Sequence, residues 1–161
     1  MIIVLRKIRK DDKKLLFDWA NDVETRRNSF NTDPIPWPVH EKWFEDQLKS
    51  ESTRIYVAQD EQGNNIGQIR FERKGDRAVL GFSINKAFRG KGLGRAVLDK
   101  GCEAIFAEWK DIAFVFGEVK RSNEPCRRVC IRANFKEEDT GGDSLVYTRS
   151  RTRNYLTMLT L

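Results

Sequence analysis

Residues 88–95 read Phe-Arg-Gly-Lys-Gly-Leu-Gly-Arg and join a segment with the pattern of a strand to a segment with the pattern of a helix. From Ala78 to Ile84 every second residue is apolar and falls on one face, which is typical of a half-buried strand. From Leu93 to Trp109, apolar or small residues recur at helical spacing. The sequence therefore predicts a strand, a tight turn and a helix in direct succession.

The turn has the features of a phosphate-binding site. Gly90, Gly92 and Gly94 permit positive φ angles and let a ligand approach the backbone closely. The first turn of a helix offers unpaired amide N–H groups and the positive end of the helix dipole, which together favour phosphate. Mobile positive charge is expected around the same point from three side chains, Arg89, Lys91 and Arg95.

The glycine spacing separates this turn from two common nucleotide-binding motifs. It lacks the Gly-Lys-Ser/Thr ending of a P-loop, and it differs from the G-x-G-x-x-G of dinucleotide-binding folds. The residues Arg89-Gly90-Lys91-Gly92-Leu93-Gly94 instead resemble the Arg/Gln-x-x-Gly-x-Gly/Ala signature of the GNAT superfamily of N-acetyltransferases. In that superfamily the loop amides hold the pyrophosphate of acetyl-CoA. The resemblance therefore implies acetyl-CoA as a co-substrate.

The composition predicts a single domain over residues 1–161. Hydrophobic residues make up 39% of the chain and charged residues 34%, a balance typical of a well-solvated globular protein. The apolar run Met1–Leu5 is too short for a membrane span or a signal segment, so we expect a cytoplasmic protein with no membrane partner. The net charge of +6 comes from basic residues scattered among 24 acidic ones, which does not favour nucleic acid as a partner.

The cysteines do not predict a disulfide framework, because there are three of them, Cys102, Cys126 and Cys130. Cys126 and Cys130 lie four residues apart on a predicted helix, so a metal pair is conceivable. The chain has one histidine and no nearby cluster of further ligands. We therefore predict buried structural cysteines and no metal site.

The remaining patterns predict, in order, strand 2–8, a helix after Asp12 to residue 20, a polar and proline-rich stretch, helix 39–49, strands 54–59, 66–73 and 77–85, the turn and its helix, strand 112–119, helix 123–133 and two final strands. This order resembles the GNAT arrangement across nearly the whole chain. The resemblance implies an α/β (α+β) fold with a mixed, mostly antiparallel central sheet of about seven strands and about four helices.

A second match lies near the C-terminus. Residues Asn123 to Phe135 resemble the superfamily segment Asn-x-x-Ala/Ser-x-x-Leu-Tyr-x-x-x-Gly-Phe, which implies that Asn123 contributes to the coenzyme site. Asn134 replaces the glycine, and asparagine also tolerates the left-handed C-cap of a helix. Cys130 stands where many members carry a tyrosine that protonates the departing CoA thiolate.

A narrower resemblance covers about thirty residues of the N-terminal third. Three stretches carry it: Trp19-Ala20-Asn21-Asp22, Thr25-Arg26-Arg27-Asn28-Ser29-Phe30 and His40-x-x-Trp43-Phe44. They resemble the subgroup that acetylates UDP-4-amino sugars in pseudaminic-acid-type pathways. The implied reaction transfers an acetyl group from acetyl-CoA to the 4-amino group of a nucleotide-linked amino sugar, through a ternary complex.

Other functions on the same fold remain open at this stage. A ribosomal-protein type of enzyme would acetylate a peptide N-terminus, and a positively charged chain suits an acidic partner of that kind. A non-catalytic module would bind acyl-CoA or nucleic acid without turnover. We expect the protein to be a monomer or a homodimer.

Acetyl transfer requires a held coenzyme, a neutral amine, a polarised carbonyl and a protonated leaving thiol. The family implies that main-chain groups of Phe82, Ser83, Ile84 and Asn85 pair with the pantetheine amides of the coenzyme. A backbone N–H there also stabilises the charge that develops on the thioester oxygen. The glycine turn, including Leu93, holds the pyrophosphate.

Several side chains are candidates for the remaining roles. The general base is predicted among His40, Glu72 and Glu118, since a protonated amine needs a proton acceptor within reach. The general acid is predicted to be Cys130 or Tyr147. Arg26, Asn28 and Ser29 are expected to bind a substrate diphosphate, because arginine matches phosphate with a planar fork. Trp37 and His40 are expected to line the substrate pocket.

Overall fold

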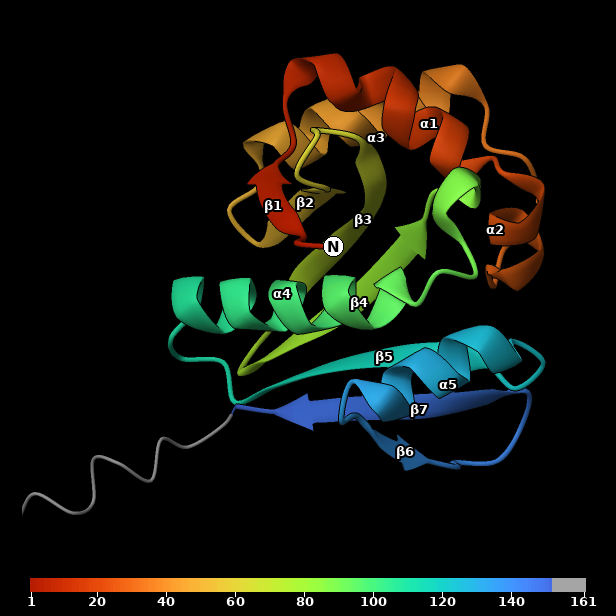
Figure 1. The fold of residues 1–161 in the computed structure, drawn as a ribbon, viewed down its shortest axis with the longest axis vertical. Helices are drawn as coiled ribbons and strands as arrows, with labels where there is room; N and C mark the ends of the chain where they lie inside the picture. The colour runs from red at the N-terminus through yellow and green to blue at the C-terminus, as the bar shows by residue number, and fades with distance from the viewer. Residues whose placement is uncertain (152–161) are drawn as a thin grey trace, which may run out of the picture.

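The computed structural model describes residues 1–151, and residues 152–161 at the end of the predicted domain lie outside the described residues (Figure 1). Its elements, in order, are β1 (Val4–Lys7), the 3-10 turn η1 (Lys10–Asp12), α1 (Lys13–Ala20), α2 (Val23–Asn28), α3 (Trp37–Lys49), β2 (Thr53–Gln59), β3 (Asn65–Lys74), β4 (Arg77–Ile84), the 3-10 turn η2 (Lys86–Phe88), α4 (Leu93–Glu108), β5 (Phe114–Lys120), α5 (Glu124–Arg132), β6 (Lys136–Glu138) and β7 (Ser144–Ser150).

The seven strands form one sheet in the order β1-β2-β3-β4-β5-β7-β6. Every neighbouring pair is antiparallel except β4 and β5, which are parallel. The expected mixed, mostly antiparallel seven-strand fold is therefore confirmed.

Among the described residues there are five α-helices, one more than the pattern predicted. The additional helix, α2, lies in the stretch that we expected to be a polar loop. The Asp22 carboxylate caps it by accepting from the amide of Thr25 at 3.1 Å. The helix has six residues and none of them is buried, so it leaves no apolar stripe in the sequence.

The parallel pairing of β4 and β5 is short. Register pairs join Arg77 to Phe114, Ala78 to Val115 and Val79 to Phe116. Beyond these pairs, β4 from Leu80 to Ile84 continues along β3, whereas β5 continues along β7. The two strands therefore diverge, and the edge of β4 that faces β5 has no strand partner over its second half.

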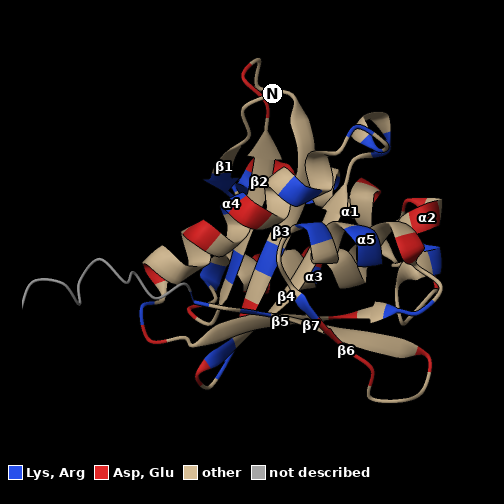
Figure 2. Cartoon of the chain, turned by 60° about the horizontal axis from the view of Figure 1, so that its bottom comes forward, with Lys and Arg blue, Asp and Glu red and all other residues tan. Residues whose placement is uncertain are grey.

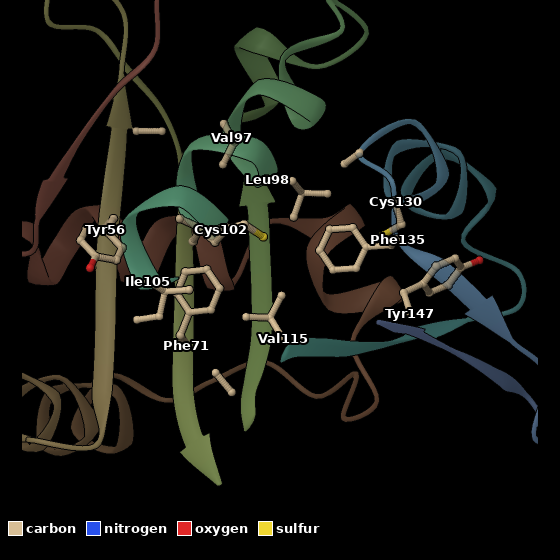
Figure 3. Packing of buried hydrophobic residues seen from close by; sticks show 14 of the residues in the cluster. Tyr56, Phe71, Val97, Leu98, Cys102, Ile105, Val115, Cys130, Phe135 and Tyr147 are labelled. Carbon is tan, nitrogen blue, oxygen red and sulfur yellow. The ribbon is translucent and has the colours of Figure 1, made fainter. Parts of the chain in front are cut away.

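Helices cover both faces of the sheet. Figure 1 shows α4 and α5 crossing the near face, with α1, α2 and α3 grouped at the top of the molecule. Side chains of α4 pack on the central strands: Leu98 and Ile105 belong to the same buried cluster as Ile69 and Phe71. Figure 3 shows Ile105 beside Phe71. Gly101 allows this close approach, since a Cβ atom there would lie 2.3 Å from Ile69 Cδ1.

A second apolar cluster holds α1 and α3 against the other face. It consists of Leu16, Trp19, Phe44, Ile55 and Val57. The last two belong to β2, so this cluster reaches no further across the sheet than that strand. The residues of β3 and β4 that point to the same face, such as Arg70 opposite Ile55, lie outside this cluster.

The charged residues follow no single surface. Figure 2 shows basic and acidic positions interspersed over the helices and strands, as expected from the sequence. Arg6 makes two hydrogen bonds to the buried Asp12 carboxylate, at 2.7 and 2.8 Å.

None of the helices within residues 1–151 has the length and apolar character needed to cross a membrane.

Glu108 fixes the C-terminal end of α4 to the sheet. Its carboxylate accepts from Tyr56 Oη at 2.8 Å and Arg54 Nε at 2.5 Å, and it pairs with Lys7 at 3.2 Å. Burial by itself raises the pKa of Glu108, but these hydrogen bonds outweigh it and hold the pKa at about 2. Because the folded pKa lies below the ordinary value of 4.5, the stabilisation is complete above pH 4.5 and is lost as the pH falls toward 2.

We therefore predict that Glu108→Gln lowers the free energy of unfolding by about 1–2 kcal/mol at pH 7, measured by urea denaturation. The difference from wild type should shrink at pH 3. Glu103→Gln, at an exposed position of the same helix, serves as the control. Equal stability of Glu108→Gln and wild type at pH 7 would contradict this account.

Candidate functional site

The glycine turn before α4 presents a row of free backbone donors. Gly90 and Gly92 have φ angles of +73° and +74°, and nothing lies within 4 Å of the place where a Cβ would stand at either residue. Within residues 1–151, the amides of residues 90–92 donate to no backbone or side-chain acceptor. The next amides belong to the first turn of α4, which lacks intrahelical acceptors. This arrangement suits an anion such as a pyrophosphate.

A cleft of about 660 Å³ extends from this turn along the divergence of β4 and β5. The start of α4, α5 and α2 supply the rest of its walls. It is lined by many of the predicted site residues: Phe82, Ser83, Ile84, Arg89, Gly90, Gly92, Leu93, Gly94, Asn123, Glu118, Cys130, Tyr147, Asn28 and Ser29. The remaining ones do not line it: Asn85, Lys91, Arg95, Arg26, Trp37, His40 and Glu72.

Arg89 is not a mobile charge, contrary to our expectation. Its Nε donates to the carbonyl oxygen of Ile84 at 3.0 Å. Its two terminal nitrogens pair with Asp22 at 2.7 Å and Glu24 at 2.9 Å. The guanidinium therefore joins the end of β4 to α2.

The other two basic side chains of the turn flank the cleft. Lys91 Nζ lies 5.3 Å from the centre of the Phe88 ring. Arg95 Nε lies 3.6 Å from an oxygen of Asp99, and its side chain is more than half exposed. Both residues are exposed and adjoin glycines that line the cleft.

Asn85 and Asn123 act as caps. Asn85 Oδ1 accepts from the amide of Ala87, and its Nδ2 donates to the carbonyl oxygen of Asn65. Asn123 Oδ1 accepts from the amide of Cys126 at the start of α5. Asn123 also lines the cleft, whereas Asn85 only fixes the turn that leads to it.

His40 lies in the protein interior, away from the cleft. The residue is 2% exposed, and Nε2 is 2.7 Å from the carbonyl oxygen of Lys13. Aromatic rings of Phe17, Trp37 and Trp43 surround it at 5.3 to 5.9 Å. Burial lowers the pKa of His40. The geometry gives His40 a structural role between α1 and α3, and it does not support a role for His40 or Trp37 at the reacting atoms.

Arg26 shapes the loop between α2 and α3. Its guanidinium donates to carbonyl oxygens of Ala20 at 2.6 Å, Asn31 at 2.9 Å and Asp33 at 3.2 Å, and to Ser29 Oγ at 3.0 Å. These contacts use the guanidinium N–H donors that we expected to bind a diphosphate. Asn28, the last residue of α2, and Ser29, its C-cap, do line the cleft.

The two candidate carboxylates lie in different concavities. Glu118 lines the main cleft beside Gly117, and its Oε1 accepts from Ser144 Oγ at 2.5 Å. Glu72 lines a smaller groove under α3 and pairs with Lys74 at 2.9 Å. Glu118 is therefore the candidate base that opens onto the cleft.

The two candidate acids hold their protons tightly. Tyr147 is 1% exposed, donates its hydroxyl to Glu137 at 2.5 Å and accepts from Arg127 Nε at 3.3 Å. Burial and the Glu137 carboxylate raise the pKa of Tyr147 to about 12. The adjacent Cys126 thiol and burial raise the pKa of Cys130. Neither group is well suited to protonate a thiolate.

Part of the cleft was not predicted from the sequence. Glu24 and Thr25 of α2 line it, as do Cys126 and Val129 of α5. The spacing Asp22-x-x-Thr25 was the available signal for α2, because it matches an N-cap and its amide partner.

Among residues 1–151 no group of three or more His, Cys, Asp or Glu side chains is arranged to hold a metal ion.

Comparisons with known proteins agree with this geometry. A family model described as an acetyltransferase (GNAT) domain matches residues 3–136. A putative phosphinothricin acetyltransferase of Bacillus subtilis (strain 168) is 28% identical over 136 residues, which is 80% of each chain.

Solved structures share the fold. A spermidine N-acetyltransferase from Vibrio cholerae in complex with CoA and spermine superposes with a TM-score of 0.78 and 18% identity, covering 91% of this chain and 92% of that one. An aminoglycoside acetyltransferase, AAC(6')-Ib, in complex with coenzyme A has a TM-score of 0.78 and 19% identity, covering 92% and 95%.

The Arg89 contacts predict that Arg89→Gln loosens α2. Losing the pairs with Asp22 and Glu24 should lower stability by about 1–2 kcal/mol and speed amide exchange in residues 23–28. Burial alone would raise the pKa of Asp22, but Arg89 and Thr25 lower it overall, so this contribution is present at neutral pH and lost as the pH falls below 3.8. Arg95→Gln is the matched control, and equal exchange of α2 in both variants would refute the role of Arg89.

Proposed function

The chain belongs to the acetyltransferase (GNAT) domain family, and from this premise we propose that residues 1–161 form one domain that acetylates a primary amine of a small molecule. Acetyl-CoA is the co-substrate of this acyltransferase family. The observation that carries the proposal is the cleft itself: it begins at free backbone donors and continues to the divergence of two parallel strands.

The coenzyme occupies the cleft from the glycine turn inward. Its pyrophosphate accepts from the amides of residues 90–95, where both the helix dipole and the positive φ angles favour close approach of an anion. Its pantetheine arm extends along the unpaired edge of β4 over residues 82–85, as an added strand would. The thioester then lies near Leu80 and Gly117, where the strands separate.

Transfer proceeds by direct attack. The amine nitrogen attacks the thioester carbon, and a free backbone N–H of β4 stabilises the oxyanion that forms. Glu118 takes the proton of the attacking amine, directly or through a water molecule. The C–S bond then breaks and CoA leaves as a thiolate, which needs little help from an acid because a thiol has a pKa of about 8.5.

A nucleotide-linked amino sugar is the acceptor that we propose within this class. The residues that suggest it, including Asn28 and Ser29, line the cleft beside the divergence of the strands. Acetyl-CoA turnover against UDP-amino sugars, polyamines and N-terminal peptides tests this choice. Turnover with peptides alone would favour the ribosomal-protein type, and coenzyme binding without turnover of any amine would favour a binding module.

The role of the turn is tested with two glycine substitutions that impose similar backbone strain. Gly92→Ala places a methyl group where the pyrophosphate approaches, so we expect the Kd for CoA, measured by calorimetry, to rise at least tenfold. Gly75→Ala is the control, because Gly75 also has a positive φ of +65° and open space around it but lies in the turn between β3 and β4. If both variants bind CoA as wild type does, the turn is not the coenzyme site.

The role of Glu118 predicts a separate effect. Glu118→Gln removes the proton acceptor but keeps an oxygen for Ser144, so kcat should fall by about 100-fold while the Kd for CoA stays unchanged. Glu138→Gln, on the exposed strand β6, should have wild-type kcat. A Glu118→Gln variant with unaltered kcat would exclude this carboxylate as the base.

A further inference from the structure

A second groove lies under α3 and meets the main cleft. It has a volume of about 390 Å³ and is bounded by Trp43 and Gln47 of α3 and by residues of β2, β3 and β4. Leu80 and Gly81 line both concavities. The groove therefore ends beside the proposed position of the thioester, on the sheet face that the α1–α3 cluster leaves open.

Arg70 lines this groove as an exposed residue, and its contact with Trp43 is a cation-π contact. Its guanidinium carbon is 5.9 Å from the centre of the Trp43 ring, and its Nε lies 3.0 Å from where a Cβ on Gly81 would stand. Within residues 1–151 its side chain forms no ion pair within 4.0 Å and no hydrogen bond, although a guanidinium carries five donors. Gly81 therefore lets the Arg70 side chain lie along β4 toward the divergence of the strands.

Arg70 and Glu72 are the two charged residues that line the groove. The nearby Glu72 carboxylate is paired with Lys74 at 2.9 Å. Arg26 forms its hydrogen bonds with neutral oxygen atoms, so no carboxylate among them neutralises its charge. A guanidinium whose donors are free can bind a carboxylate or a phosphate through two parallel hydrogen bonds.

We propose that Arg70 determines acceptor specificity by binding an anionic group of the acceptor, a carboxylate or a phosphate, while the acceptor's amine reaches the thioester past Leu80 and Gly81. The inference rests on the proposed acetyl transfer and adds to it the class of acceptor. The charge of Arg70 disfavours the binding of polycations such as spermine beside it.

The test compares acceptors that differ in one anionic group. Glucosamine 6-phosphate is paired with glucosamine, and L-methionine with L-methioninamide, with spermidine as a polycation. Arg70→Met removes the charge and keeps the apolar stem. Lys110→Met is the control, since Lys110 is exposed beyond the end of α4 and its loss changes the net charge equally. Steady-state kinetics and calorimetry on the CoA-saturated protein are measured for each variant.

For wild type we expect lower KM and Kd values for the anionic member of at least one pair, and the pair that responds identifies phosphate or carboxylate as the recognised group. Arg70→Met should raise the KM and the Kd for that member by about 10- to 100-fold and leave its kcat unchanged. The KM and the Kd for the member that lacks the anionic group should not change in Arg70→Met. Lys110→Met should match wild type for both members.

Equal effects of Arg70→Met on both members of each pair, or a preference of wild type for spermidine, would overturn the inference. If no amine is acetylated, the proposed function fails. Calorimetric binding of an anionic acceptor that is lost in Arg70→Met would still support the anion site, and absence of such binding in wild type would refute it.

Discussion

The separation of β4 from β5 is the constraint on which the rest of the site depends. The two strands pair at one end only, because β4 follows β3 while β5 follows β7 beyond Val79 and Phe116. A fully paired sheet would satisfy its backbone groups internally and present two closed faces. Divergence instead leaves an unpaired edge inside the molecule and an opening between its faces. A coenzyme bound to that edge from one face can thus meet an acceptor that arrives from the other.

Arginines hold the elements around this opening by binding carbonyl and carboxylate oxygens. Arg89 ties the end of β4 to α2, and Arg26 fixes the loop that follows α2. The guanidinium groups of Arg89 and Arg26 therefore have a structural role. Their donors, which the sequence suggested for ligand binding, are hydrogen-bonded within the protein. Arg70 differs, because within residues 1–151 it forms no ion pair within 4.0 Å and no hydrogen bond, although Glu72 lines the same groove. Arg89 and Arg26 are hydrogen-bonded within the protein, whereas the donors of Arg70 are free to bind a ligand in the groove under α3.

The strand-turn-helix unit and the order of the elements were predictable from local patterns, because glycine spacing and apolar periodicity act over a few residues. The short helix α2 was not predicted, because it buries no side chain and so leaves no apolar periodicity in the sequence. His40 was misplaced for another reason: its burial depends on the packing of Phe17 and Trp43 around it, which no local pattern encodes. Likewise, Glu72 and Glu118 look equivalent as residues at strand ends, and only the register of the strands assigns them to different concavities.

Hydrogen–deuterium exchange with and without acetyl-CoA tests the central claim most directly. If the coenzyme lies along the free edge of β4, exchange should slow in residues 80–84 and in residues 90–95 together. The backbone of β1, far across the sheet, should exchange as before. Protection of the glycine turn without any change in β4, or no protection of either segment, would contradict the account.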